Sequence, residues 1–321
     1  MTTRTLRVLA PGLLASVQDV GRFGYRASGV ALGGALDRIA LVTANRMAGN
    51  SDDAAAIECT LGALRVRFDA PTRVALAGAE CDAMLDGVRL AAWSCAPVAA
   101  GSELMLGRPR AGARTIVAVG GGIDVPVVLG SRSTDLGAGF GGFDGRALRA
   151  GDCVPFGEPS SSRGAFRLQP PQWALRAPED DAGVVSVRAL AGPEAPAFGE
   201  ALWATPWTIA PQSNRMGYRL HGTPLAVPDG AGTLASHAVM PGLVQVPPDG
   251  QPIVLLADAQ TTGGYPRAAV VIEADLWRLA QASAGTRVRF ARVTLDQARA
   301  ARADVEAYLA ATGRTIAEHV Q

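Results

Sequence analysis

The chain has 321 residues, of which 48% are hydrophobic, and it contains 38 Gly and 21 Pro. This composition indicates a globular protein of about two domains with many turns and short strands. Its 30 basic residues are all arginines and are balanced by 29 acidic residues to a net charge of +1, which favours neither nucleic acid nor a membrane surface as a partner. The absence of lysine excludes a Schiff-base lysine, a P-loop lysine and a biotin-accepting lysine.

Cysteines and histidines are few and scattered. They are Cys59, Cys81, Cys95, Cys153, His221, His237 and His319. No CxxC pair or other ligand spacing occurs, so we expect no metal site. Residues 1–18 lack the apolar core of a signal peptide, and no segment is long and apolar enough to span a membrane. We therefore expect a reduced, cytoplasmic protein whose thiols fill buried space.

The first 60 residues predict a strand, a polar loop and a helix. Leu6–Leu9 has the pattern of a short strand. In the loop that follows, Asp19 and Arg22 are close enough in sequence to pair with each other or to face a ligand. A helix is expected from the N-cap Asp37 to the stop signal at Gly49. A second short helix is expected to start at Ser51.

Residues 64–157 have the pattern of closely spaced β-strands separated by Gly or Pro turns. The expected strands are Val66–Phe68, Arg73–Ala77, Ala83–Leu85, Glu103–Leu106 and Thr115–Val119. Regular spacing of short strands predicts a barrel or a sandwich rather than alternating β-α units.

A glycine-rich region at residues 120–135 allows two interpretations. The backbone N–H groups of Gly130–Asp135 can cradle an anion, with Arg132 supplying positive charge. Alternatively, the glycines make tight corners in a β-protein, because the region lacks the lysine of a P-loop.

The second half resembles the first in two short stretches. A linker is expected at Pro159–Arg163, followed by a strand at Val184–Leu190. Residues 189–194 (ALAGPE) repeat residues 75–80 (ALAGAE) at five of six positions, and Gly263-Gly264 with Pro266 echoes Gly121-Gly122 with Pro126. These repeats suggest two related β-domains.

Two polar loops in the second half carry the side chains best suited to a ligand. Between Pro211 and Gly217 an amide, a hydroxyl and the guanidinium of Arg215 can hold a carboxylate, carbonyl or phosphate. The alternative is a solvated surface turn.

The second loop follows a predicted turn at Pro247–Gly250 and a buried strand at Ile253–Ala257. Polar residues 258–262 come next, and Gly263-Gly264 then lets the backbone approach a partner closely. The alternative is a structural turn whose polar groups satisfy local backbone. A helix capped by Asp275, a strand at Arg287–Phe290 and a helix at Thr294–Ala311 complete the prediction.

Five motifs in order carry a resemblance to a known family. They are PGLLASVQDVGRFGY, GGALDRIALVTANRMAGN, GGIDVPVVLGSRSTD, PQSNRMGYRL and VPPDGQPIVLLADAQTTGGYPR. From about Leu6 to Phe290 the chain resembles the allophanate hydrolase subunit 2 family, also described as biotin-dependent carboxyltransferase-like. The resemblance implies a mainly β fold with a few helices and two cyclophilin-like β-barrel subdomains. We expect these at 1–158 and 165–293, followed by a C-terminal helix at 294–321.

The family includes the C subunit of bacterial 5-oxoprolinase, which implies an ATP-dependent lactam hydrolase active only with subunits A and B. A lactam is a poor electrophile, and phosphorylating its carbonyl oxygen would create a leaving group that lets water open the ring to glutamate. The resemblance therefore implies ATP and Mg²⁺, bound here or shared with the B subunit. It implies no biotin attached to this chain.

Site residues follow from the matching motifs. Catalytic roles are implied for Gln212, Arg215 and Thr262. Substrate or nucleotide binding is implied for Ser213, Tyr218, Gln260, Thr261, Gly263, Gly264 and Tyr265, with Asp19, Arg22 and Arg132 as a second group.

Two other functions are compatible with the resemblance. The family includes the carboxyltransferase part of urea carboxylase, which moves a carboxyl group from carboxybiotin to urea. It also includes antagonists of kinase inhibitors, which act by binding protein without turnover. In that case the polar loops would form a protein interface.

Overall fold

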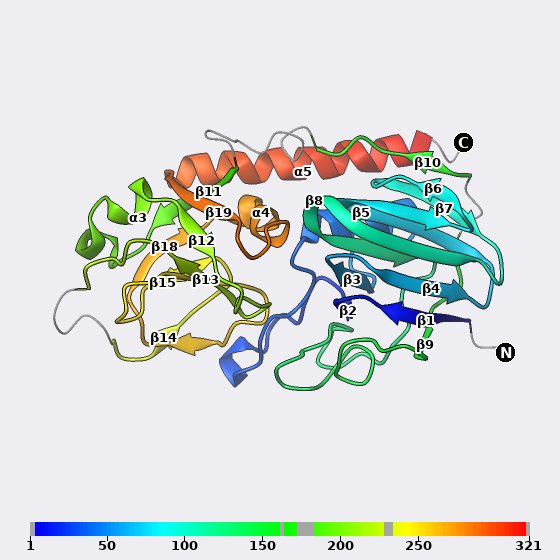
Figure 1. Cartoon of the computed structure of the whole chain (residues 1–321), viewed down its shortest axis with the longest axis horizontal. Helices are drawn as coiled ribbons and strands as arrows, with labels where there is room; N and C mark the ends of the chain where they lie inside the picture. The colour runs from blue at the N-terminus through cyan, green and yellow to red at the C-terminus, as the bar shows by residue number, and fades with distance from the viewer. Residues whose placement is uncertain (1–3, 161–163, 172–182, 228–233, 319–321) are drawn as a thin grey trace. The chain divides into compact units, whose positions relative to one another are not determined.

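The computed structural model describes residues 4–160, 164–171, 183–227 and 234–318 (Figure 1). The chain divides into two compact units. The first contains Met1–Phe23, Gly33–Pro170 and Ala307–Gln321, and the second contains Gly24–Leu32 and Pro171–Glu306. Most of the expected linker at Pro159–Arg163 lies outside the described residues.

The first unit is built on a ten-stranded sheet. Its strands are β1 (Thr5–Pro11), β2 (Leu14–Gln18), β3 (Ala56–Thr60), β4 (Leu64–Phe68), β5 (Thr72–Leu85), β6 (Val88–Leu90), β7 (Ser94–Val98), β8 (Glu103–Val119), β9 (Cys153–Pro155) and β10 (Phe166–Arg167). The main path runs β10-β7-β5-β8-β4-β1-β9, while β3 pairs with β8, β2 with β3, and β6 with β5. The predicted strands are confirmed, but β5 and β8 each join two of them.

Alternation along these strands separates two cores. Leu76 and Val117 face the main core of the unit, where Phe68 and Leu104 are also buried. Alternate residues such as Ile116 face the other side of the sheet, against α1 (Arg38–Ala48). Both faces of the central strands are therefore buried, which explains their continuous apolar sequences.

The predicted ends of α1 are confirmed. The Asp37 side chain accepts a hydrogen bond of 2.9 Å from the N–H of Ala40, and Gly49 ends the helix with a φ of 83°. The short helix expected at Ser51 is wrong, because this segment is a turn that leads directly into β3. Asp52 there binds the guanidinium of Arg46 instead of capping a helix.

The second unit contains a closed seven-stranded barrel (Figure 1). In sequence order its strands are β11 (Val184–Ala191), β12 (Trp207–Ile209), β13 (Gly217–His221), β15 (Leu243–Gln245), β16 (Ile253–Leu255), β18 (Arg267–Val271) and β19 (Arg287–Arg292). The order around the barrel is β11-β18-β15-β16-β13-β12-β19, and β11 pairs with β19 in parallel. Outside the barrel, β14 (His237–Ala238) pairs with β17 (Thr262–Gly263). The mainly β fold predicted from the sequence is confirmed.

Helical segments in the described part of the chain are short, apart from α1 and α5. The others are η1 (Arg26–Ser28), η2 (Ala195–Phe198), α3 (Ala201–Ala204), η3 (Glu273–Asp275) and α4 (Leu276–Ala280). Asp275 precedes α4 as predicted, but its carboxylate binds the backbone and guanidinium of Arg188 and makes no cap.

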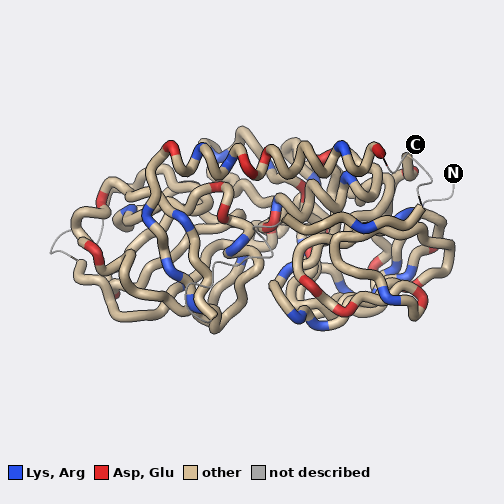
Figure 2. Tube along the Cα trace, turned by 90° about the horizontal axis from the view of Figure 1, so that it is seen from above, with Lys and Arg blue, Asp and Glu red and all other residues tan. Residues whose placement is uncertain are grey.

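The last helix, α5 (Leu295–Glu318), contributes to both units. Ala301 packs in a small core of the second unit with Ile272, while Ile316 packs in the α1 core of the first. Acidic and basic residues are interspersed along the helix and over the rest of the chain (Figure 2). None of the described helices has the length and apolar character needed to cross a lipid bilayer.

Candidate functional site

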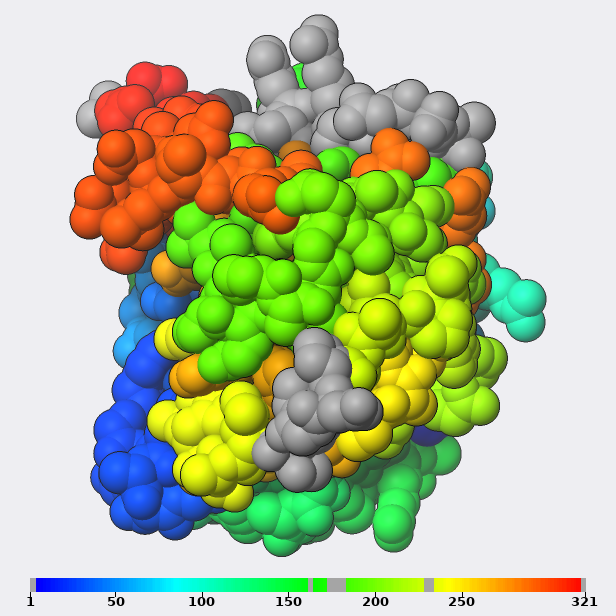
Figure 3. Space-filling view, turned by 90° about the vertical axis from the view of Figure 1, so that its left-hand side faces the viewer, coloured from blue at the N-terminus to red at the C-terminus, as the bar shows by residue number. Residues whose placement is uncertain are grey.

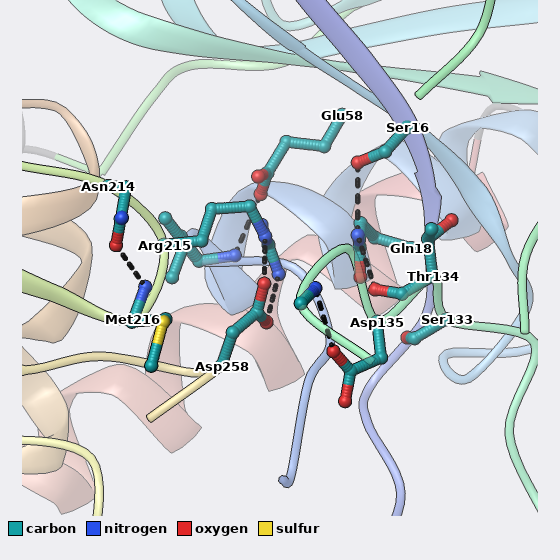
Figure 4. Close-up of polar contacts among 12 residues, drawn as sticks. Ser16, Gln18, Glu58, Ser133, Thr134, Asp135, Asn214, Arg215, Met216 and Asp258 are labelled. Atoms are coloured by element: carbon teal, nitrogen blue, oxygen red, sulfur yellow. Dashed lines mark hydrogen bonds and ion pairs between the residues drawn. The ribbon is translucent and has the colours of Figure 1, made fainter. Parts of the chain in front are cut away.

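A buried ion pair joins the two polar loops of the second unit. Arg215, between β12 and β13, donates from Nε and Nη2 to the two carboxylate oxygens of Asp258, at 2.9 and 3.0 Å (Figure 4). Both side chains are about 5% exposed or less. The backbone N–H of Asp258 also donates to the carbonyl of Arg215 at 3.1 Å. The loops that sequence analysis treated separately are thus fixed to each other.

The tip of the first loop is shaped by its own side chains. Asn214 accepts a hydrogen bond of 2.8 Å from the N–H of Met216 (Figure 4). Ser213 accepts a bond of 3.1 Å from the N–H of Arg219, across the loop. The side chain of Gln212 is exposed. Gln212, predicted to be catalytic, and Ser213, predicted to bind substrate or nucleotide, therefore lie at an ordered tip, with Gln212 facing solvent.

Tyr218 lies apart from the exposed polar side chains. It is 3% exposed, and its hydroxyl donates a hydrogen bond of 3.1 Å to the carbonyl of Ala282. This hydrogen bond gives Tyr218 a structural role in the second unit, where it links β13 to the backbone at Ala282.

The second loop runs alongside β14. Thr261 accepts a hydrogen bond from the N–H of Val239 at 3.0 Å through its carbonyl, and Thr262 and Gly263 form β17. Gln260, Thr262 and Tyr265 expose their side chains.

The close approach predicted for Gly263 and Gly264 occurs within the chain itself. A Cβ on Gly263 would lie 2.9 Å from Nε2 of Gln245, and one on Gly264 would lie 2.8 Å from the carbonyl oxygen of Leu234. Real Cβ atoms do not approach other atoms this closely. Glycine is therefore required at position 264, where the obstacle is backbone, whereas at position 263 the Gln245 side chain would have to move.

In the first unit, Asp19 holds two loops together. Its carboxylate accepts hydrogen bonds from Gly21 N–H at 2.8 Å, Ser131 hydroxyl at 2.7 Å, Arg132 N–H at 2.6 Å and Ser133 hydroxyl at 2.5 Å. The side chain is buried. Four donors satisfy the carboxylate, so its role in this structure is to position residues 131–133.

Arg22 does not pair with Asp19. It is fully buried, and it donates to the carbonyls of Val128 at 3.0 Å and Ser133 at 2.7 Å. Its guanidinium also stacks 4.7 Å from the ring centroid of Phe140. Sequence analysis left open whether Asp19 and Arg22 pair with each other or face a ligand. In the structure each residue binds the 128–140 loop independently.

Of the two interpretations of the glycine-rich region, an anion cradle is not formed by residues 131 to 135. The backbone N–H groups of residues 131 to 135 all have acceptors inside the chain. These acceptors are the carbonyls of Val128, Val17 and Phe140, the carboxylate of Asp19 and the hydroxyl of Ser131. Arg132 directs its guanidinium to the carbonyl of Val125 and the carboxylate of Asp124. The tight-corner interpretation is supported by Gly121, Gly122 and Gly130, which have φ values of 89°, 71° and 75°.

A buried polar row on the sheet of the first unit was missed by sequence analysis. Ser16 and Glu58 are direct neighbours on β2 and β3. Glu58 accepts a hydrogen bond of 2.7 Å from the N–H of Leu36 and lies 3.8 Å from Nε of buried Arg114. Nε2 of Gln18 donates to the Ser16 hydroxyl at 3.0 Å (Figure 4). Polar residues alternating with core residues in strands buried on both faces were the available signal.

No metal centre is built from the residues that the structure describes. No group of three or more His, Cys, Asp or Glu side chains comes together there.

Comparisons with known proteins agree with these observations. Residues 28–292 match the family described as carboxyltransferase domain, subdomain A and B. The chain is 45% identical to the 5-oxoprolinase C subunit of Escherichia coli, over 94% of this chain and 96% of that protein. It is 39% identical to the 5-oxoprolinase C subunit of Haemophilus influenzae, over 95% and 96% of the two chains.

A solved structure extends the likeness to the fold. The crystal structure of the K. lactis urea amidolyase superposes with a TM-score of 0.86 at 28% identity. The match covers 96% of this chain but only 20% of that much longer chain. The family model matches most of the chain, and the two 5-oxoprolinase C subunits align with it over nearly their whole length. The chain therefore belongs to the carboxyltransferase domain family, subdomains A and B.

Proposed function

We propose that this chain is the C subunit of an ATP-dependent 5-oxoprolinase. The observation that carries the proposal is the 45% identity to a 5-oxoprolinase C subunit, which extends over nearly the full length of both proteins. The reaction opens the lactam of 5-oxoproline to L-glutamate, and the chain acts together with subunits A and B.

The chemical requirement is activation of a stable amide. The lactam carbonyl is a weak electrophile, and transfer of the γ-phosphoryl group of ATP to its oxygen, with release of ADP, activates the carbon for addition of water. The C–N bond then breaks to free the amine and leave an acyl phosphate, which water hydrolyses to glutamate and phosphate. A protein assists such a step mainly by positioning the reactants and stabilising developing negative charge. Hydrogen-bond donors on rigid loops provide both functions.

The second unit supplies such loops. The buried Arg215–Asp258 pair fixes the relative position of the two loops. Gln212 and Thr262, one on each loop, remain exposed at their surface. We propose that these two side chains donate hydrogen bonds to the substrate or to the transferred phosphoryl group. In this arrangement Arg215 positions the loops through Asp258.

ATP and Mg²⁺ are proposed to be shared with the B subunit. The chain has no lysine to bind a phosphate. The described residues bring no cluster of three carboxylate, imidazole or thiol ligands together. We therefore assign Mg²⁺ no ligand in this chain and derive no step through it.

A second candidate is carboxyl transfer from carboxybiotin to urea or another amide. The fold match to a urea amidolyase favours it, with a TM-score of 0.86. Biotin would have to be carried on another protein, since this sequence has no lysine to which it could be attached. Both candidates present an amide-like substrate to an activated carrier.

The test is glutamate release from 5-oxoproline by the chain mixed with its cognate A and B subunits. Activity should require ATP and all three proteins when each is omitted in turn. A correctly assembled complex that consumes ATP but releases no glutamate would contradict the proposal. The same complex would then be assayed for transfer of label from carboxybiotin to urea.

A further inference from the structure

The segment Gly24–Leu32 brings an arginine to the candidate loop of the second unit. This segment belongs to the second unit although its sequence neighbours on both sides belong to the first. Nη2 of Arg26 donates to the carbonyls of Val239 and Gln260, the latter at 3.4 Å. In Figure 3, the blue surface that includes this segment borders yellow surface from the region around β14. Arg26 is thus anchored one residue from Thr261.

Arg26 carries a charge that the described part of the chain does not neutralise. Its hydrogen-bond partners there are two backbone carbonyls, and no carboxylate lies within ion-pair distance among those residues. Nη1 is buried and has no acceptor among the same residues. Burial lowers the pKa of this guanidinium, which reflects the cost of holding the charge away from water.

Other arginines of the unit are satisfied differently. Arg188 and Arg267 each form a bidentate pair with a carboxylate, Asp275 and Glu194 respectively. Desolvated N–H groups without an acceptor are costly, and a guanidinium fork matches a carboxylate in geometry. The missing acceptor of Arg26 is therefore best supplied by a ligand.

Nη1 itself is buried, but the residues around Arg26 are exposed, so a ligand would approach from their side. Tyr25 is 37% exposed, and the side chain of Gln260 is exposed on the other side of the anchoring bond. Thr262, two residues further along the loop, is exposed as well. Consecutive residues span at most about 3.6 Å each, so Thr262 lies within about two such steps of the Gln260 anchor, a distance that a small ligand can bridge.

We propose that Arg26 binds the carboxylate of the lactam substrate and thereby selects an anionic lactam over a neutral amide. This inference rests on the proposed function, and it names the residue that distinguishes 5-oxoproline from an uncharged substrate such as urea. Arg26 is a binding residue in this proposal, while Gln212 and Thr262 act on the reacting end.

The experiment uses the assembled complex with Arg26→Gln, Arg26→Lys or the control Arg287→Gln. Arg287 is an exposed arginine on β19 of the same unit, so the control removes the same charge elsewhere. Steady-state assays give kcat and KM for 5-oxoproline, KM for ATP, and the inhibition constant of 5-oxoprolinamide, which has the same ring without the negative charge.

Arg26→Gln should raise KM for 5-oxoproline by about 10- to 100-fold, the range expected for loss of a charge-assisted hydrogen bond. The inhibition constant of the neutral amide and KM for ATP should not change. Arg26→Lys should fall between wild type and Arg26→Gln, and Arg287→Gln should match wild type.

An equal loss of affinity for 5-oxoproline and for 5-oxoprolinamide would overturn the proposal, because a purely structural role of Arg26 would affect both ligands. A change confined to KM for ATP would also overturn the proposal, because it would mean that Arg26 binds a phosphate group of ATP and not the substrate carboxylate. If thermal melting shows that Arg26→Gln is unfolded, Arg26→Lys carries the same comparison. Failure of the proposed function itself would appear separately, as a wild-type complex that releases no glutamate.

Discussion

The guanidinium of Arg215 and the carboxylate of Asp258 form two hydrogen bonds with each other, and both side chains are almost fully shielded from water. The two residues are 43 positions apart in the chain. The net attraction within a buried ion pair adds little to the free energy of unfolding. Removing one partner is costly, however, because the other charge is then buried without a partner.

Asp258→Asn is therefore expected to be strongly destabilising. Removing the carboxylate charge should lower the free energy of unfolding by about 3–5 kcal/mol, seen as a lower urea midpoint. The control Arg302→Ala breaks an exposed pair on α5 and should be nearly neutral. The double variant Arg215→Met with Asp258→Leu should recover part of the loss. A double variant whose loss of stability equals the sum of the losses in Arg215→Met and in Asp258→Leu would contradict this account.

Asp19→Ala tests whether Asp19 is structural or binds ligand. The change removes the acceptor of four hydrogen bonds in a buried position and should cost at least about 3 kcal/mol in urea unfolding. Asp124→Asn, at an exposed pair with Arg132, serves as the control and should be nearly neutral. Normal stability of Asp19→Ala, together with a raised KM for 5-oxoproline in the complex, would instead show a direct binding role.

The Glu194–Arg267 pair should make stability depend on acid pH. Hydrogen bonds from Arg267 hold the pKa of Glu194 below its ordinary value of 4.5. The folded state therefore favours the ionised form. This contribution is fully present above the ordinary pKa and disappears as pH falls through the lower folded pKa.

Glu194→Gln should consequently reduce stability at about pH 7 by at most about 1 kcal/mol, since the pair is partly exposed. The difference between wild type and variant should shrink as pH falls below about 4. Urea midpoints measured across this range provide the test. A difference that stays constant into acid would mean that the pair does not contribute through ionisation.

The four cysteines should differ sharply in reactivity. Cys153 is exposed, whereas Cys59, Cys81 and Cys95 are buried. Burial raises the pKa of the Cys59 thiol to about 12, which leaves almost no thiolate to react. A thiol reagent at about pH 8 should modify one cysteine rapidly in the native protein and four after denaturation. Cys153→Ser should abolish the rapid phase, and rapid labelling that survives this change would place the reactive thiol elsewhere.

Local signals in the sequence were sufficient where one residue determines the backbone. Asp37 and Gly49 fix the two ends of α1, and Gly250, with a φ of 72°, closes the predicted turn after Pro247. Strand lengths were harder to predict. Residues around Gly78 have the sequence of a turn, yet β5 continues through them because bulges let it remain paired with β8.

Side-chain partners were the least predictable part of the candidate site. The motifs identified Arg215, but pairing with Asp258 depends on how two distant loops meet. Nearness in sequence allowed Asp19 and Arg22 to pair or to face a ligand, whereas in the structure each is bound by the loop at 128–140. Arg26 gave no local signal, because its role depends on carbonyls more than 200 residues away. Tertiary packing decides such contacts, and spacing along the chain does not reveal them.

The assignment of Gly24–Leu32 to the second unit has a practical consequence for dissecting the gene. An expression fragment limited to residues 171–306 would contain every strand of the barrel but would lack Arg26. The carbonyls of Val239 and Gln260 would lose their shared donor, and the loop that bears Gln260 and Thr262 would lose one of its anchors. Grafting the nine residues 24–32 onto such a fragment through a linker is the minimal way to retain that anchor.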